Sequence, residues 1–183
     1  MPLDLAEECI SSETIASGGM LTVKRDQVRL PNGHVSQREY VIHPGAVVVV
    51  PMLVNGHIVL ERQFRYPLGR VFIELPAGKI DAGEDTLTTG QRELLEETGY
   101  RANHWVKLGA VHPCIGYSNE VIHVYLAYDL HAGKHRPDED ESLEIFAQGF
   151  TETIDQIQSG EITDAKTIAA LFLAERYIRD NPL

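Results

Sequence analysis

The chain has 183 residues, of which 43% are hydrophobic and 23% charged, so it suits one compact soluble domain and is unlike a disordered chain. Its 27 acidic residues outnumber its 16 lysines and arginines, and the formal net charge of -11 argues against a nucleic-acid partner. No stretch approaches the roughly 18 consecutive apolar residues of a membrane-spanning helix, and the first residues lack the pattern of a signal peptide. We therefore expect a cytoplasmic protein with no membrane partner.

The first predicted element is a two-stranded ribbon. Residues 21–30 and 36–43 have strand patterns, and the Pro-Asn-Gly sequence at 31–33 suits a hairpin turn between them. Two strands are poorly stable alone, so we expect the ribbon to lie on its own domain or on a second subunit. We predict an N-terminal extension over residues 1–44 and a main domain over 45–183.

The main domain is predicted to combine strands and helices. The Val-rich run at 45–54 predicts a strand buried on both faces. Further strands are expected at 57–62, 71–75, 105–111, 120–130 and 144–148, and helices at 86–98, 151–159 and 164–179. A central sheet covered by helices on both faces is the natural packing of these elements.

Three glutamates stand at helical spacing within the segment 78–100, which reads GKIDAGEDTLTTGQRELLEETGY. Glu93, Glu96 and Glu97 occupy positions i, i+3 and i+4, so their carboxylates project from one face of one helix. Such a face is either solvated and screened by arginine or binds a hard divalent cation such as Mg²⁺, which prefers oxygen ligands. The spacing alone leaves both interpretations open.

The whole segment resembles the Nudix box, a pattern of one glycine, one glutamate and an Arg-Glu-apolar-any-Glu-Glu-any-Gly motif at fixed spacing. Its positions are filled here by Gly78, Glu84, Arg92, Glu93, Leu94, Glu96, Glu97 and Gly99, with Tyr100 where an aliphatic residue is usual. The resemblance implies an α/β Nudix fold, in which a mixed β-sheet is sandwiched between α-helices (an α/β/α sandwich) and carries an N-terminal β-ribbon.

The resemblance also assigns roles to the residues of the box. It implies two or three Mg²⁺ ions per site, with Mn²⁺ as a substitute, held by Glu93, Glu97, Glu96 and the carbonyl of Ala77. Gly78, Glu84, Arg92 and Gly99 are implied to be structural, with Arg92 and Glu84 forming an ion pair that orients the loop against the helix.

The segments around the box resemble the ADP-ribose pyrophosphatase branch of this family. ELPAGKID overlaps the start of the box, ERQFRYP lies upstream and HPCIGYSNE lies downstream. The resemblance implies that metal-activated water hydrolyses the pyrophosphate of ADP-ribose to AMP and ribose 5-phosphate. The alternatives are another nucleoside-diphosphate sugar or NADH as the substrate, or a non-catalytic domain that senses nucleotides.

Substrate contacts are expected outside the box. Arg65 is the candidate for binding phosphate, and the alternative is a strand-edge arginine paired with an acid. By resemblance, Arg38 and Glu39 of the ribbon hold the adenine. Ser118 and Glu120 line the terminal ribose, or they serve only the turn in which they lie.

The general base is expected in the acidic segment RPDEDES. Glu141, with Glu139 as the close competitor, resembles the family's loop glutamate that activates water, and Glu141 is also implied as a metal ligand. A run of four acids is otherwise a solvated turn. Because the family exchanges its ribbon between subunits, we also expect a homodimer. Trp105 is interpreted as a packing residue.

Overall fold

The computed structural model describes residues 4–133 and 142–181. The chain forms two compact units. The first comprises Met1–Pro44 with Cys114–Glu120, and the second comprises Gly45–Pro113 with Val121–Leu183. The short segment 114–120, which the sequence analysis includes in the main domain, therefore belongs by its contacts to the first unit.

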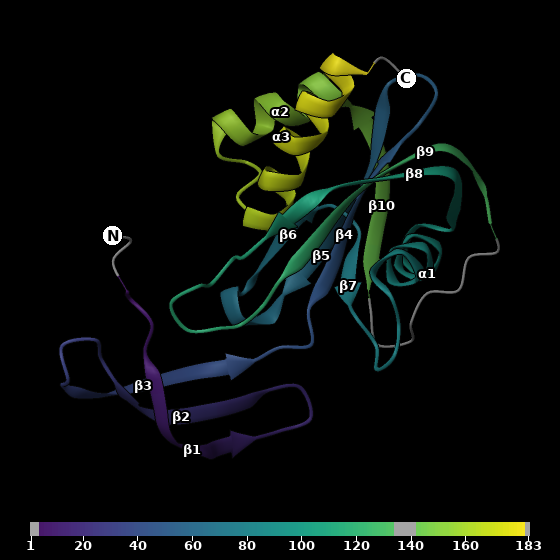
Figure 1. Cartoon of the computed structure of the whole chain (residues 1–183). Coiled ribbons are helices and arrows are strands. Elements are labelled where there is room, and N and C mark those ends of the chain that lie inside the picture. The colour runs from purple at the N-terminus through teal and green to yellow at the C-terminus, as the bar shows by residue number, and fades with distance from the viewer. Residues whose placement is uncertain (1–3, 134–141, 182–183) are drawn as a thin grey trace. The chain divides into compact units, whose positions relative to one another are not determined.

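The first unit is a three-stranded antiparallel sheet of β1 (Glu8–Ser17), β2 (Thr22–Arg29) and β3 (Val35–Ile42), in the order β1-β2-β3 (Figure 1). The two predicted ribbon strands are β2 and β3, which pair as an antiparallel hairpin. The third strand, β1, was not predicted, because its sequence ECISSETIAS alternates too weakly between apolar and polar residues to be recognised. The segment 114–120 is fastened to the end of β3. Val41 N–H donates to the carbonyl of Tyr117 at 2.8 Å, and His43 N–H donates to Oδ1 of Asn119 at 2.7 Å.

The second unit is built on a mixed seven-stranded sheet. Five strands lie in the order β10-β5-β4-β9-β8, while β6 pairs with β5 and β7 pairs with β4. The pairing of β4 with β9 is parallel and the other pairings are antiparallel. The strands are β4 (Ala46–Met52), β5 (His57–Arg65), β6 (Arg70–Glu74), β7 (Ala77–Lys79), β8 (Tyr100–Val111), β9 (Ile122–Ala132) and β10 (Leu143–Gly149).

Helices cover both faces of this sheet, as predicted. They are α1 (Thr86–Thr98), α2 (Phe150–Ser159) and α3 (Ala165–Asp180), and a short 3-10 helix spans Tyr66–Leu68. Figure 1 shows α1 apart from the pair α2 and α3, with the sheet between them. No helix among the described residues is long and apolar enough to cross a membrane.

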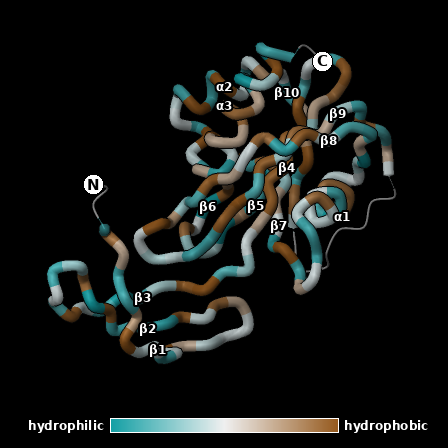
Figure 2. The backbone as a smooth tube through the Cα atoms, in the orientation of Figure 1, coloured by the Kyte–Doolittle hydropathy of each residue, from teal (hydrophilic) through white to brown (hydrophobic). Residues whose placement is uncertain are grey.

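Strand β4 explains why the second unit has two apolar cores. All seven of its residues are buried, and successive side chains point to opposite faces. Val48 and Val50 pack with α2 and α3 in one core, while Val47 and Val49 pack with Leu94 of α1 in the other. Figure 2 shows the hydrophobic residues concentrated along these central strands. The Val-rich run therefore fixes the layer order around α1.

Helix α1 begins and ends at residues with specific capping roles. The carboxylate of Asp85 accepts hydrogen bonds from the backbone N–H groups of Leu87 and Thr88, which satisfies donors that the first turn leaves unpaired. Gly99 has a φ of 73°, the left-handed conformation predicted for it, and its N–H donates to the carbonyl of Leu95. The helix that carries the glutamates is thus fixed at both ends.

Candidate active site

Helix α1 places two buried glutamates on the same face. Glu93 and Glu97 lie four residues apart, slightly more than one helical turn, and retain only 9% and 5% of their surface. The Glu97 carboxylate accepts a hydrogen bond from the N–H of Ala77 at 2.9 Å, which links α1 to β7. Burying carboxylates is costly unless cations or hydrogen bonds compensate their charge, so this face is suited to binding cations.

Gly78 allows the Glu93 carboxylate to lie directly against the backbone of β7. A side-chain carbon at position 78 would lie 1.8 Å from Oε1 of Glu93 and 2.0 Å from its Cδ, far inside van der Waals contact. Any residue other than glycine would therefore displace this carboxylate. The glycine that opens the box is explained by this close approach.

Arg92 connects the acidic residues around α1. Its Nε and Nη2 donate to the two carboxylate oxygens of Glu84 at 3.1 and 3.0 Å. Its Nη1 donates to Glu93 at 2.8 Å and to Glu96 at 3.1 Å, and Nη2 also reaches the carbonyl of Lys79. One guanidinium thus ties the loop before the helix to two of the three glutamates on it.

This pairing sets the charge state of the loop acid. The hydrogen bond from Arg92 is the main reason why the pKa of Glu84 lies below its usual value, and Thr89 Oγ1 adds a hydrogen bond at 2.8 Å. The same pairing raises the pKa of Arg92. Glu84 is therefore a charged structural partner of Arg92 and is poorly suited to exchange protons near neutral pH.

The donor set around α1 fits a hard divalent cation. Among the described residues, no three acidic, histidine or cysteine side chains are already gathered around one point. Mg²⁺, however, commonly takes only a few protein oxygens and completes its shell with waters and phosphate oxygens. Two buried carboxylates, Glu93 and Glu97, packed against the backbone at Ala77 and Gly78, match that requirement.

Arg65 lies in a buried charge network at the end of β5. Its Nε and Nη2 each donate to the Glu74 carboxylate at 2.7 Å, and only 2% of the Glu74 side chain is exposed. Lys166 of α3 donates to the same carboxylate and, at 2.9 Å, to Asp164. Burial by itself raises the pKa of Glu74, but the hydrogen bonds from Arg65 and the charge of Lys166 outweigh it and leave that pKa lowered.

Both interpretations of Arg65 find support in this geometry. The arginine is paired with an acid, as the alternative expected, yet 40% of its side chain remains exposed and it borders a hollow of about 250 Å³. The pair uses Nε and Nη2, and Nη1 has no hydrogen-bond partner among the described residues. Glu74 fixes the guanidinium of Arg65 through Nε and Nη2, so Nη1 is suited to donate to an anion.

Glu74, which holds Arg65, and Lys166, which contacts the same carboxylate, were not predicted from the sequence. One signal was available for Glu74: a carboxylate inside the apolar strand sequence VFIEL is unusual, because charged residues are rarely buried without a partner. Lys166 gave no comparable signal, since it is 92 residues from Glu74 and stands in the first turn of a helix.

The predicted adenine contacts Arg38 and Glu39 belong to the first unit and project from opposite faces of β3, since neighbouring strand residues alternate. Arg38 donates to Glu7 at 2.6 and 3.0 Å, whereas Glu39 accepts from Arg25 at 2.8 Å. Both side chains are already in ion pairs. Within a single subunit, Arg38 and Glu39 therefore cannot contact the same adenine ring from two sides.

Ser118 and Glu120, the predicted ribose contacts, also belong to the first unit. Oγ of Ser118 accepts a hydrogen bond from the N–H of Glu120 at 3.1 Å, and the Glu120 carboxylate lies 3.7 Å from Nδ1 of His43. The first contact is a turn contact of the kind that the alternative expected, whereas the second joins the segment 114–120 to the residue that follows β3. Glu139 and Glu141, the candidate bases, lie outside the described residues.

Comparison with known proteins identifies both segments of the chain. Residues 42–171 match the NUDIX domain, and residues 7–41 match the nucleoside diphosphate sugar hydrolase N-terminal domain. The chain is 41% identical over 169 residues to "ADP-ribose pyrophosphatase" of Bacillus subtilis, covering 91% of each protein. It is 39% identical over 169 residues to "Methanol dehydrogenase activator" of Bacillus methanolicus, covering 90% of each.

A solved structure supports the same relationship. The structure described as "Crystal structure of ADP compounds hydrolase" superposes with a TM-score of 0.87 at 25% sequence identity and covers 96% of each chain. The mixed sheet between helices, the glutamates of α1 and the match over residues 42–171 agree with one another. This chain belongs to the Nudix family.

Proposed function

We propose that the protein hydrolyses the pyrophosphate of ADP-ribose to AMP and ribose 5-phosphate with the help of divalent metal ions. The observation that carries the proposal is the pair of buried carboxylates, Glu93 and Glu97, packed on the glycine backbone of β7. Further support comes from the relative named as an ADP-ribose pyrophosphatase, from the solved ADP compounds hydrolase, and from the nucleoside diphosphate sugar hydrolase segment at residues 7–41.

The residues of the box divide the work between binding and orientation. Glu93 and Glu97 would hold the metal, with Glu96 and the carbonyl of Ala77 as additional ligands, and we propose Mg²⁺ with two or three ions per site. A Mg²⁺ ion held by these residues would neutralise the charge of the pyrophosphate and lower the pKa of the attacking water. Arg92 orients the glutamate side chains, because it donates to both Glu93 and Glu96.

Outside the box, Arg65 is proposed to bind a phosphate oxygen with its free Nη1 edge while Glu74 holds the opposite edge. A loop carboxylate, Glu141 or Glu139, is proposed as the base that takes the proton of the attacking water. Arg38 and Glu39 remain the proposed adenine contacts, and Ser118 and Glu120 the proposed ribose contacts. Since Arg38 and Glu39 face opposite sides of β3, they would serve different sites in a dimer.

The decisive experiment compares hydrolysis of ADP-ribose, GDP-mannose, a UDP-sugar and NADH in Mg²⁺. We expect ADP-ribose to rank first, with AMP and ribose 5-phosphate as products. Glu97→Gln should lose at least about a hundredfold in kcat, because one buried metal carboxylate is removed. Glu175→Gln, an exposed glutamate of α3, is the matched control and should retain full activity.

Each unfavourable result would exclude a different part of the proposal. A low rank for ADP-ribose would exclude that substrate but leave the hydrolase. A Glu97→Gln protein as fast as the parent would move the chemistry to another site. Binding of ADP-ribose without any hydrolysis would favour a nucleotide-sensing domain, although such a domain has no evident need for all the glutamates of the box.

A further inference from the structure

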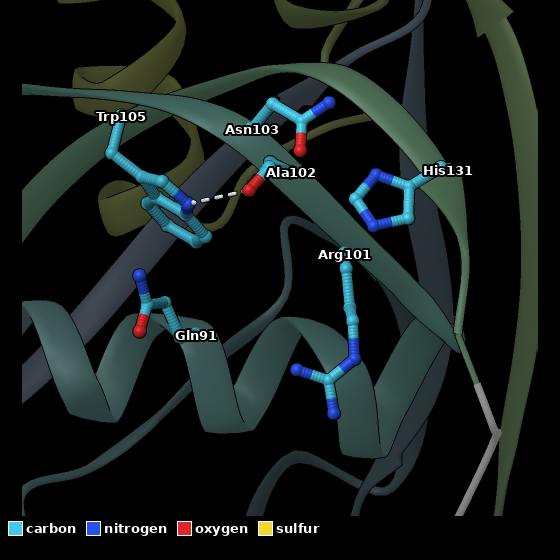
Figure 3. Close-up of a pocket in the computed structure, with 6 residues that line it drawn as sticks. All are labelled: Gln91, Arg101, Ala102, Asn103, Trp105 and His131. Atoms are coloured by element: carbon cyan, nitrogen blue, oxygen red, sulfur yellow. Dashed lines mark hydrogen bonds between the residues drawn. The ribbon is translucent and has the colours of Figure 1, made fainter.

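A second hollow lies on the other side of α1, away from the glutamates. It has a volume of about 260 Å³ and is lined by Gln91 of α1, by Arg101, Ala102, Asn103 and Trp105 of β8, and by His131 of β9 (Figure 3). Gln91 is two residues before Glu93, which places the two side chains about 200° apart around the helix. The hollow is therefore separate from the face of α1 that carries Glu93 and Glu97.

The charge of this hollow differs from that of the chain as a whole. The protein carries a formal charge of -11, yet the part of the chain that the structure describes lines the hollow with Arg101 and His131 and with no acidic side chain. Within residues 4–133 and 142–181, every other arginine makes an ion pair or a hydrogen bond, whereas Arg101 makes none with a described residue. In so acidic a chain, an arginine without a carboxylate partner is available to bind an external anion.

One wall of the hollow is a rigid aromatic ring. The indole N–H of Trp105 donates to the carbonyl of Ala102 at 3.2 Å, and the ring meets Tyr125 edge-on with centroids 6.2 Å apart. Helix α1 packs against the same ring, since a side-chain carbon at Gly90 would lie 3.4 Å from it. These contacts fix the ring, and a fixed indole provides a stacking surface for a planar ligand.

Two side-chain amides, those of Gln91 and Asn103, complete the lining. The side-chain amide of Gln91 makes no hydrogen bond with a described residue. Asn103 uses its Nδ2 to donate to Asp129 at 2.9 Å, which orients the amide and leaves Oδ1 as an acceptor. In Figure 3, Gln91 lies below Trp105, Arg101 lies to the right of Gln91, and His131 lies above and to the right of Arg101. Amides at these positions suit the nitrogen and oxygen atoms of a heterocycle.

We propose that this hollow binds a nucleoside monophosphate, with the phosphate on Arg101 and the base against Trp105. A single guanidinium suits one phosphate, and the volume lies below the roughly 300–1,000 Å³ of sites for drug-sized ligands. The inference does not rest on the proposed hydrolysis. If that hydrolysis is correct, AMP belongs to the ligand class, and its reaction product would bind on the reverse side of the helix that carries the glutamates.

The chain offers a local reporter for this site, because Trp105 is its only tryptophan. AMP is titrated into the full-length protein in EDTA, which removes divalent ions from the proposed active site, while tryptophan emission is recorded. We expect saturable quenching. Arg101→Gln should weaken the affinity for AMP at least tenfold. Adenosine, which lacks the phosphate, should bind to the parent with the same weak affinity as AMP binds to Arg101→Gln. Inorganic phosphate should compete with AMP.

Matched variants separate this site from other effects. Arg176→Gln removes an exposed arginine of α3 and should leave the AMP titration unchanged. Arg101→Lys keeps the charge without the fork and should bind with intermediate affinity. Unchanged emission on addition of AMP, or quenching of equal affinity in the parent and in Arg101→Gln, would overturn the proposal.

Discussion

At Gly78, the conformation of the backbone and the position of a carboxylate depend on each other. The atoms that a new side chain would meet belong to the end of the Glu93 side chain, which can rotate away, and not to backbone. A substitution there should therefore cost little folding energy and should mainly change where the carboxylate points. This separates a functional role of the glycine from a role in stability.

We predict that Gly78→Ala lowers kcat about a hundredfold while the midpoint of urea unfolding changes little. Displacing a reacting or metal-binding group by about 1 Å has this order of effect on rate. Steady-state kinetics and Mn²⁺ binding measured by electron paramagnetic resonance would test it, and Mn²⁺ affinity should fall in parallel. A variant that unfolds readily but retains its kcat per folded molecule would contradict the argument.

Glu74 is predicted to act through Arg65, whose guanidinium it holds with two hydrogen bonds. Glu74→Gln should reduce kcat/KM on the order of tenfold, or about 1.4 kcal/mol, mainly by raising KM. In an Arg65→Met background the same change should have no further effect on kcat/KM. Glu144→Gln is the control, because it removes the partner of Arg62, an arginine on the same strand as Arg65. It should leave kcat/KM unchanged.

That double-mutant cycle also separates positioning from general damage. If the two losses in kcat/KM add, Glu74 does not work through Arg65, even though the enzyme hydrolyses ADP-ribose. If the parent shows no hydrolysis, the proposed function itself fails. The experiment therefore distinguishes a failure of the positioning role of Glu74 from a failure of the proposed function.

The Glu74 carboxylate should make the stability of the protein depend on pH. The pKa of Glu74 is lowered in the folded protein, so its contribution to stability is present above the unfolded pKa and is lost as the pH falls through the folded value. We expect the difference in unfolding free energy between the parent and Glu74→Gln to shrink between about pH 5 and pH 3. Urea unfolding at several pH values would measure it, and a constant difference would contradict it.

The stability of helix α1 depends on the residues that cap its two ends. Gly99, the capping residue after Thr98, has a φ of 73°, which other residues adopt at a cost. Gly99→Ala should destabilise the protein by about 1 kcal/mol, whereas Gly99→Asn should cost less because asparagine tolerates the left-handed conformation. Urea unfolding of both variants tests this, and equal losses for both would point to packing instead of backbone conformation.

The elements that sequence analysis predicted are those with a strong local pattern. The buried strand β4 and the helix α1 have a valine run and a capped acidic motif, and both were found within two residues of their predicted ends. Strands β1 and β7 were missed for different reasons. β1 is exposed throughout and its apolar residues do not alternate with polar ones, whereas β7 is only three residues long and is defined by its pairing with β4.

At the scale of the whole molecule, the first unit has little core of its own. Val28 is the one buried residue among its described residues, while Leu5, Met20 and Val35 expose 73%, 70% and 55% of their surface. A three-stranded sheet with so little burial needs a further surface to cover its apolar side chains. We therefore propose that a second copy of the chain covers this sheet.

Light scattering at micromolar concentration should give a mass near twice 20.4 kDa. Val35→Glu, which introduces a charge into the exposed sheet, should shift the protein toward the monomer. Val54→Glu alters an equally apolar residue of the second unit, 94% exposed, and should leave the mass unchanged. A monomeric parent would exclude the dimer.

The sequence alone determined the features that depend on neighbours along the chain. The spacing of Glu93 and Glu97 puts them on one helical face because the helix repeats every 3.6 residues, whatever the rest of the fold does. Only the tertiary structure decided which charges meet across the fold. Glu74 is held by a lysine 92 residues away, and Arg101 has no partner within residues 4–133 and 142–181, because packing brings no carboxylate of those residues to it. Such pairings depend on how strands and helices pack, and no local pattern encodes that.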